Sequence, residues 1–140
     1  MDKSSQRKAL RTIVANISDK ASQSEKIASI LQDTSLPSGS ICIYNSLPSE
    51  VDTKAIIEYF SKSRQVYLPV VDGEDIALVK VNNDTKYQAG SWGISEPIGE
   101  RLSPKDVRPA VTITPLLGAD KKLNRLGKGK GYYDRYFASV

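Results

Sequence analysis

The chemically most suggestive part of the sequence is a glycine-rich basic segment near its end, residues 124–134. Glycine and lysine alternate there, in the order Gly127, Lys128, Gly129, Lys130 and Gly131. Alternate glycines allow backbone conformations that other residues avoid, so that successive N–H groups converge on an anion. The segment therefore predicts a site for a compact anion such as phosphate.

The residues around the glycines extend this prediction to a polyphosphate. Arg125 adds mobile charge, and Asp134 could hold a divalent cation that bridges phosphate oxygens. A helix that begins near Gly131 would add the positive end of its dipole. The spacing is neither that of a P-loop nor that of the dinucleotide fingerprint, in which Tyr132 would have to be a third glycine. The alternative is a flexible basic loop with a solvated face.

Composition narrows the function classes. The chain has 140 residues, a net charge of +4 and no histidine, which excludes histidine bases and histidine metal sites. Cys42 is the only cysteine, so no internal disulfide can form, and we expect it to be a buried small hydrophobe. Residues 120–135 carry six cations and two anions, so the remainder is electroneutral, and a nucleic-acid partner is not expected. No apolar run approaches the ~20 residues of a membrane span, and the polar start predicts a cytoplasmic location.

Hydrophobic periodicity predicts the elements that position these residues. Helices are expected over 4–17, 19–31, 53–62 and from 131, and strands over 40–44, 65–71, 76–81 and 111–114. In the second helix, Ile27, Ile30 and Leu31 are expected to face inward. The strand–helix–strand order predicts a parallel pair in a single α/β domain, residues 1–140. The segments 82–109 and 116–130 are predicted as long loops, the first of them functional.

The run from Arg125 to Arg135 resembles the signature of the 5-formyltetrahydrofolate cyclo-ligase family. Residues 7–11, 44–53, 67–71 and 93–97 are similar to further family segments, in the same order along the chain. The resemblance implies a three-layer α/β sandwich with a mostly parallel central sheet flanked by helices. It also implies an enzyme that uses Mg-ATP to convert 5-formyltetrahydrofolate to 5,10-methenyltetrahydrofolate, releasing ADP and phosphate. Neither a membrane nor a nucleic acid is an expected partner, and a monomer or weak homo-oligomer is expected.

The resemblance also implies roles for particular residues. Lys130, Arg125 and Glu50 are expected to be catalytic, with Lys130 stabilising transition-state charge and Glu50 facing the folate. Mg²⁺ is expected on Asp134, and the folate is expected against Asn45, Glu50, Trp92 and Tyr132. The residues expected to hold ATP are Arg7, Lys8, Arg11, Arg125, Leu126, Gly127, Lys128, Gly129, Lys130, Gly131, Tyr132 and Tyr133.

The sequence departs from the family pattern in two places. In the loop before the signature, the family has a glycine, an aromatic residue and a second glycine. This sequence has Leu116, Ala119 and Leu123 at those positions, which predicts a different path for the loop. Family members also continue for further residues after the helix that begins near residue 131. C-terminal strands are therefore expected to be shortened or missing here, which would leave a sheet edge that oligomerisation would pair. One alternative is a non-catalytic nucleotide- or folate-binding member of the fold. The other is a small RNA-binding protein that stacks bases on Tyr132, Tyr133 and Tyr136.

Overall fold

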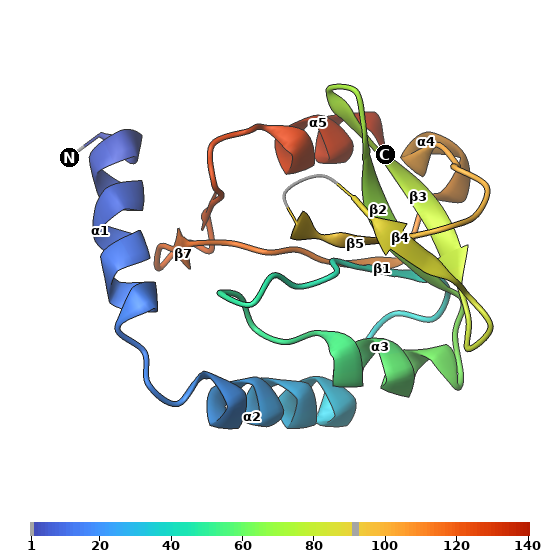
Figure 1. Cartoon of the computed structure of the whole chain (residues 1–140), viewed down its shortest axis with the longest axis horizontal. Coiled ribbons are helices and arrows are strands. Elements are labelled where there is room, and N and C mark those ends of the chain that lie inside the picture. The colour runs from blue at the N-terminus through green and yellow to red at the C-terminus, as the bar shows by residue number, and fades with distance from the viewer. Residues whose placement is uncertain (1, 91–92) are drawn as a thin grey trace.

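The computed structural model describes residues 2–90 and 93–140 (Figure 1). The helices are α1 (Lys3–Ala15), α2 (Lys20–Asp33), α3 (Lys54–Ser61), α4 (Pro104–Val107) and α5 (Tyr132–Ser139). The strands are β1 (Ile41–Ile43), β2 (Val66–Asp72), β3 (Asp75–Val81), β4 (Tyr87–Ala89), β5 (Ser95–Pro97), β6 (Val111–Ile113), β7 (Gly118–Ala119) and β8 (Arg125–Leu126). Within these residues, no helix combines the length and apolar character that crossing a bilayer requires.

A four-stranded sheet with the order β3-β2-β1-β6 forms the centre of the fold. β1 runs parallel to both of its neighbours, with Ile41 opposite Val66 on β2 and Val111 on β6. β3 pairs antiparallel with β2 along its whole length. The predicted parallel pair is confirmed, with α3 in the crossover between its strands, and the mostly parallel α/β architecture is confirmed as well.

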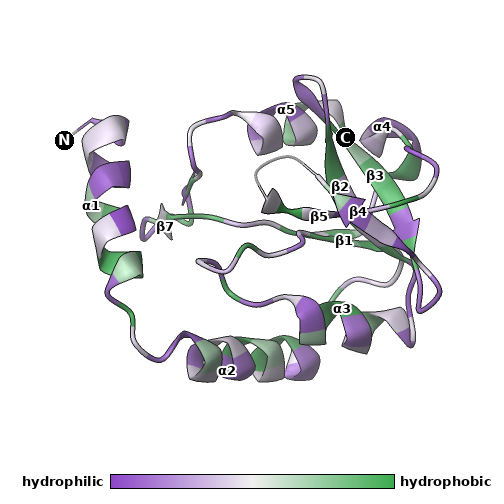
Figure 2. Ribbon diagram, viewed as in Figure 1, coloured by the Kyte–Doolittle hydropathy of each residue, from purple (hydrophilic) through white to green (hydrophobic). Residues whose placement is uncertain are grey.

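Helices cover both faces of this sheet, which explains why its strands are apolar (Figures 1 and 2). Side chains alternate along a strand, so Ile41 and Ile43 of β1 pack in one cluster with Phe60 of α3. Cys42, between them, packs in a second cluster with Tyr136 of α5. Cys42 is 1% exposed, and burial raises the pKa of its thiol to about 12. The thiol therefore stays protonated and unreactive, as expected of a small buried hydrophobe.

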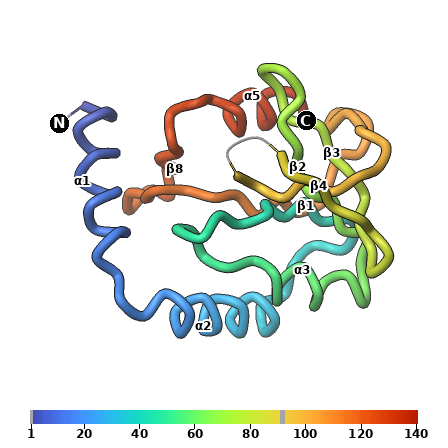
Figure 3. The backbone as a smooth tube through the Cα atoms, viewed as in Figure 1, coloured from blue at the N-terminus to red at the C-terminus, as the bar shows by residue number. Residues whose placement is uncertain are grey.

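The first two helices pack less closely than their apolar patterns predict. In α2 the buried residues are Ser24 and Ala28, whereas Ile27 is 38% and Ile30 65% exposed. The prediction that these two isoleucines face inward is therefore wrong, and only Leu31 packs against the core as expected. α2 thus contacts the core through small side chains, and Ile30 lies on its solvent side. α1 buries no residue at all and stands at one side of the molecule (Figure 3).

The two long segments predicted as loops contain regular structure. β4 and β5 pair within residues 82–109, and α4 begins there at Pro104 after Ser103. A proline at the first helical position after a serine is a helix-start signal that the loop prediction overlooked. In residues 116–130, β7 and β8 form a second antiparallel pair. These elements were missed because each has only two to four residues, too short for periodicity to register.

Leu123 lies in the turn between β7 and β8 with a φ of 65° and is 85% exposed. A left-handed backbone costs an L-residue roughly 1–2 kcal/mol, whereas glycine adopts it freely. We therefore expect Leu123→Gly to raise the free energy of unfolding by about 0.5–1 kcal/mol, since little apolar burial is lost. Urea denaturation measures this, with Leu116→Gly as the control. An unchanged or lower stability of the Leu123 variant contradicts the prediction.

Candidate functional site

A cleft of about 490 Å³ opens where the parallel strands of the central sheet end. Tyr44 and Asn45 enter it directly after β1, and Pro115 enters it shortly after β6. Ligands of open α/β sheets commonly bind outside the carboxyl ends of the strands. Because the cleft is also lined by α1 and by the glycine-rich segment, the topology brings residues from both ends of the chain to one site.

One wall of the cleft is strongly cationic. Among the described residues, six cationic side chains and two carboxylates line it; the cations are Lys3, Arg7, Arg11, Arg125, Lys128 and Lys130. The first three recur every fourth residue, which places them on one face of α1. Lys8 lies off that face and does not line the cleft. Lys3 was not predicted as a site residue, although its four-residue spacing from Arg7 already indicated that the two share a helix face.

Two guanidinium groups attach α1 to the glycine-rich segment. Arg7 Nε donates to the carbonyl of Gly127 at 2.9 Å, and Arg11 Nη2 donates to that of Lys128 at 3.2 Å. A Cβ on Gly129, whose φ is 101°, would lie 3.5 Å from the Arg7 guanidinium. The segment therefore turns its carbonyls toward α1 and is held there by charge-assisted hydrogen bonds.

Arg125 connects three parts of the site. Its Nη1 donates to the Pro115 carbonyl at 2.9 Å, and its Nη2 lies 3.7 Å from Asp134 Oδ1. Its guanidinium carbon is also 5.4 Å from the centre of the Tyr133 ring. A Cβ on Gly127 would lie only 2.7 Å from Arg125 Nη1, so glycine leaves room for this arrangement. Arg125 thus holds the wall in shape as well as contributing charge.

The glycine-rich segment ends in a helix start that faces the cleft. Gly131 occupies the N-cap of α5 with a φ of 76° and no side-chain cap. Arg135 donates to the backbone carbonyls of Lys130, at 3.3 Å, and of Glu74, at 2.7 Å. The first turn of α5 is therefore anchored to the β2–β3 turn, with its positive dipole end beside the lysines.

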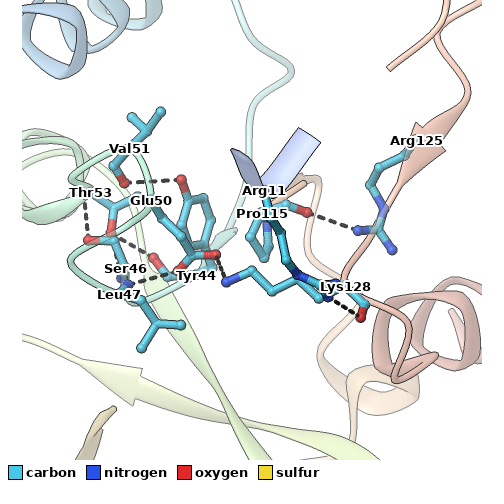
Figure 4. A network of polar contacts seen from close by, with 10 residues as sticks. All are labelled: Arg11, Tyr44, Ser46, Leu47, Glu50, Val51, Thr53, Pro115, Arg125 and Lys128. Atoms are coloured by element: carbon cyan, nitrogen blue, oxygen red, sulfur yellow. Dashed lines mark hydrogen bonds and ion pairs between the residues drawn. The ribbon is translucent and has the colours of Figure 1, made fainter. Parts of the chain in front are cut away.

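The opposite wall carries Glu50, in the loop between β1 and α3 (Figure 4). Its side chain is 11% exposed. Oε1 accepts a hydrogen bond from the Leu47 N–H at 2.7 Å, and Oε2 lies 3.0 Å from Lys128 Nζ. A carboxylate and a lysine that are far apart in the sequence thus meet as a close ion pair across the cleft.

Thr53 fixes the shape of this loop and is fully buried (Figure 4). Its Oγ1 donates to the Tyr44 carbonyl at 2.8 Å and accepts from the Ser46 N–H at 3.2 Å. Its own N–H donates to Ser46 Oγ at 3.1 Å, and the Tyr44 hydroxyl donates to the Val51 carbonyl at 3.1 Å. These bonds close the loop into one conformation and so determine where Glu50 stands.

We expect Thr53→Val to destabilise the protein by about 1–3 kcal/mol. The substitution nearly keeps the side-chain volume, but it leaves the Tyr44 carbonyl and the Ser46 N–H without the Thr53 hydroxyl as a partner. Thr12→Val is the matched control. It removes a hydroxyl that donates to the Lys8 carbonyl at 3.2 Å on the exposed face of α1. Thermal and urea unfolding of both variants measure the difference. Equal effects of the two substitutions would show that the loop does not depend on Thr53.

The floor of the cleft is apolar and aromatic. It is formed by Tyr44, Leu47, Pro69, Val70, Val71, Ile76, Ile94, Tyr132 and Tyr133. Burial raises the pKa of Tyr133 well above its usual value, and the charge of Glu50 raises it further. Burial, with Glu50 and Asp52 nearby, likewise raises the pKa of Tyr44. Both phenols therefore stay protonated and can act only as neutral hydrogen-bonding groups.

The structure brings most of the predicted site residues into this one cleft. Asn45 lines it, and its Nδ2 donates to the Ser95 carbonyl at 2.7 Å, which ties the β5 segment to the site. Leu126 lies in the lining beside the glycines. Trp92 lies outside the described residues. Tyr132 and Tyr133 of the floor were predicted, but its aliphatic part was not, because a run such as 69–71 looks the same whether a strand end faces a core or a cleft.

The carboxylates of the site fit a metal ion only in part. The described residues contain no cluster of three potential metal ligands. Asp134 is 86% exposed and stands beside Arg125 at the cleft margin. Mg²⁺ in nucleotide sites is often held by one or two carboxylates plus phosphate oxygens and water. A single carboxylate therefore suits an ion carried largely by a bound polyphosphate.

Comparisons with known proteins agree with this geometry. A model of the 5-formyltetrahydrofolate cyclo-ligase family matches residues 1–140. The chain is 30% identical to a probable 5-formyltetrahydrofolate cyclo-ligase of Schizosaccharomyces pombe, over 99% of this chain and 72% of that protein. It is 36% identical to the 5-formyltetrahydrofolate cyclo-ligase of Haemophilus influenzae, over 68% of this chain and 54% of that protein. This match and others to proteins of the same name span about half the length of the relative.

Two solved structures resemble this fold. The NMR structure of Aquifex aeolicus 5,10-methenyltetrahydrofolate synthetase superposes with a TM-score of 0.82 at 35% identity, covering all of this chain and 74% of that one. A 5,10-methenyltetrahydrofolate synthetase from Mycoplasma pneumoniae superposes with a TM-score of 0.69 at 21% identity, covering 79% of that chain. The second likeness concerns the fold alone.

Proposed function

Because the chain belongs to the 5-formyltetrahydrofolate cyclo-ligase family, we propose that it converts 5-formyltetrahydrofolate to 5,10-methenyltetrahydrofolate with ATP. The observation that carries the proposal is the two-sided cleft. A cationic wall with a glycine-rich backbone suits a polyphosphate, and an apolar, aromatic floor beside a carboxylate suits a folate ring system. Both lie in one cavity, as a reaction between the two ligands requires.

The proposed reaction needs positioning and charge stabilisation rather than a protein nucleophile. The formyl oxygen of the folate attacks the γ-phosphorus, and ADP leaves. N10 then attacks the activated formyl carbon and the five-membered ring closes. The bond from that carbon to the phosphate oxygen breaks, and phosphate leaves together with the N10 proton. Cationic groups that hold the equatorial oxygens lower the barrier of such phosphoryl transfers. The buried, protonated Cys42 has no part in this chemistry.

We assign the phosphates to Arg7, Arg11, Lys128 and Lys130, with Lys130 stabilising the transferring group. Glu50 is assigned to an N–H group of the folate ring, with Asn45 beside it. Arg125 acts by shaping the wall, since its guanidinium already contacts Pro115, Asp134 and Tyr133. Asp134 is assigned as one ligand of a Mg²⁺ ion that enters with the nucleotide. The ion would supply charge neutralisation at the phosphates.

The direct test mixes the protein with Mg-ATP and 5-formyltetrahydrofolate and follows the absorbance of the methenyl product together with ADP release. A rise that requires both ligands supports the ligase. ATP binding without folate-dependent ADP release would instead identify a non-catalytic member of the fold. The RNA-binding alternative is disfavoured because Tyr136 is only 3% exposed and cannot stack on a base.

A further inference from the structure

We infer that the ion pair between Glu50 and Lys128 is a latch that couples the binding of the two substrates. This inference rests on the proposed function, in which Lys128 holds phosphate and Glu50 holds folate. Each side chain is the other's partner at 3.0 Å. Neither ligand can therefore take its full set of contacts while the pair is closed.

The position of the pair supports a latch. A second, mostly apolar cavity of about 300 Å³ lies between the first two helices and the segment after β6. Glu50 and Lys128 line both this cavity and the main cleft, as do Tyr44 and Pro115. The ion pair therefore forms part of the boundary between the two cavities, and opening it enlarges the space available to ligands.

The two partners differ in how freely they can move. Lys128 is fixed through its backbone, whose carbonyl accepts from Arg11, while its four-carbon side chain is 36% exposed (Figure 4). Glu50 is 11% exposed and belongs to the loop that Thr53 closes. Opening the latch therefore means that Lys128 swings away while Glu50 stays in place.

Opening leaves the Glu50 carboxylate with its hydrogen bond from the Leu47 N–H. A largely buried carboxylate that loses its counter-ion is unfavourable until another donor reaches it. An N–H group of the folate supplies that donor, and a phosphate supplies the new partner of Lys128. Each ligand binding alone bears the cost of opening, whereas a second ligand finds the latch already open. The two affinities must then rise reciprocally.

The test measures 5-formyltetrahydrofolate affinity by calorimetry, with and without a non-hydrolysable ATP analogue and Mg²⁺. We expect the analogue to tighten folate binding to the wild type by about 5-fold, at the lower end of allosteric couplings. In Lys128→Met the latch is absent, so folate alone binds several-fold more tightly and the analogue adds little. This outcome is discriminating, because removing a cation would otherwise weaken binding of an anionic folate. Lys122→Met, a charge loss outside both cavities, is the matched control.

A failure of folate to bind would itself overturn the proposed function. A second measurement keeps the latch testable in that case. Inorganic triphosphate in metal-free buffer is titrated into Glu50→Gln and Asp134→Asn. Both variants remove one carboxylate from the same cleft. Glu50→Gln releases Lys128 from its ion pair. Asp134→Asn does not release Arg125 in the same way, because Arg125 keeps its contacts to Pro115 and Tyr133. A clearly larger gain in triphosphate affinity in Glu50→Gln than in Asp134→Asn supports the latch. Equal gains, or a weaker folate affinity in Lys128→Met, would overturn it.

Discussion

Replacing Lys130 by alanine is expected to lower turnover by about 100- to 1,000-fold, the usual cost of removing one group that stabilises a developing oxyanion. Lys130 lies in the cleft between Gly129 and Gly131, whose φ angles of 101° and 76° set the path of the backbone around it. The hydrogen bond from Arg135 goes to the backbone carbonyl of Lys130, which an alanine at this position keeps.

The measurement is steady-state ADP release that depends on 5-formyltetrahydrofolate, with circular dichroism to verify folding. Lys122→Ala is the matched control, because it removes an exposed lysine of the β7–β8 turn that does not line the cleft. Lys130→Arg should recover part of the rate, since it keeps the charge and changes the geometry. Full turnover in Lys130→Ala would remove this lysine from the phosphate site.

Glu50→Ala is expected to weaken 5-formyltetrahydrofolate binding by about 10- to 100-fold, because a hydrogen bond to a charged group contributes roughly 1.5–3 kcal/mol. The substitution removes the carboxylate, with its bonds to Leu47 N–H and Lys128 Nζ. Because Lys128 then remains available to phosphate, ATP binding should not weaken. The asymmetry between the two ligands is the diagnostic result.

Calorimetric titration of each ligand separately measures that asymmetry. Glu96→Ala is a suitable control, since Glu96 pairs with Arg101 at 3.6 Å and lines neither cavity. Equal losses for folate and ATP would mean that Glu50 only supports the loop. A thermal unfolding comparison with Thr53→Val would then show whether both residues act on the same structure.

The sequence by itself determined the elements that have a long pattern. The stripe in residues 4–17 and the runs 65–71 and 76–81 have enough periods to show their type, and the structure has α1, β2 and β3 there. The glycine–lysine alternation identified the cationic segment for a similar reason, since residue types and spacing are local properties. The family resemblance rested on this segment together with four shorter ones in the same order, and the family match confirms it.

Tertiary structure alone decided how those pieces meet. Nothing local to residue 50 or residue 128 predicts their ion pair, which exists because β1 ends at the cleft and Arg11 holds the Lys128 carbonyl to α1. The exposure of Ile30 and the absence of buried residues in α1 were likewise outside the reach of periodicity. A pattern shows which face of an element is apolar, but burial depends on what packs against that face. The family and the residue types of the cleft were therefore readable from the chain, whereas the partners of each charged group had to come from the fold.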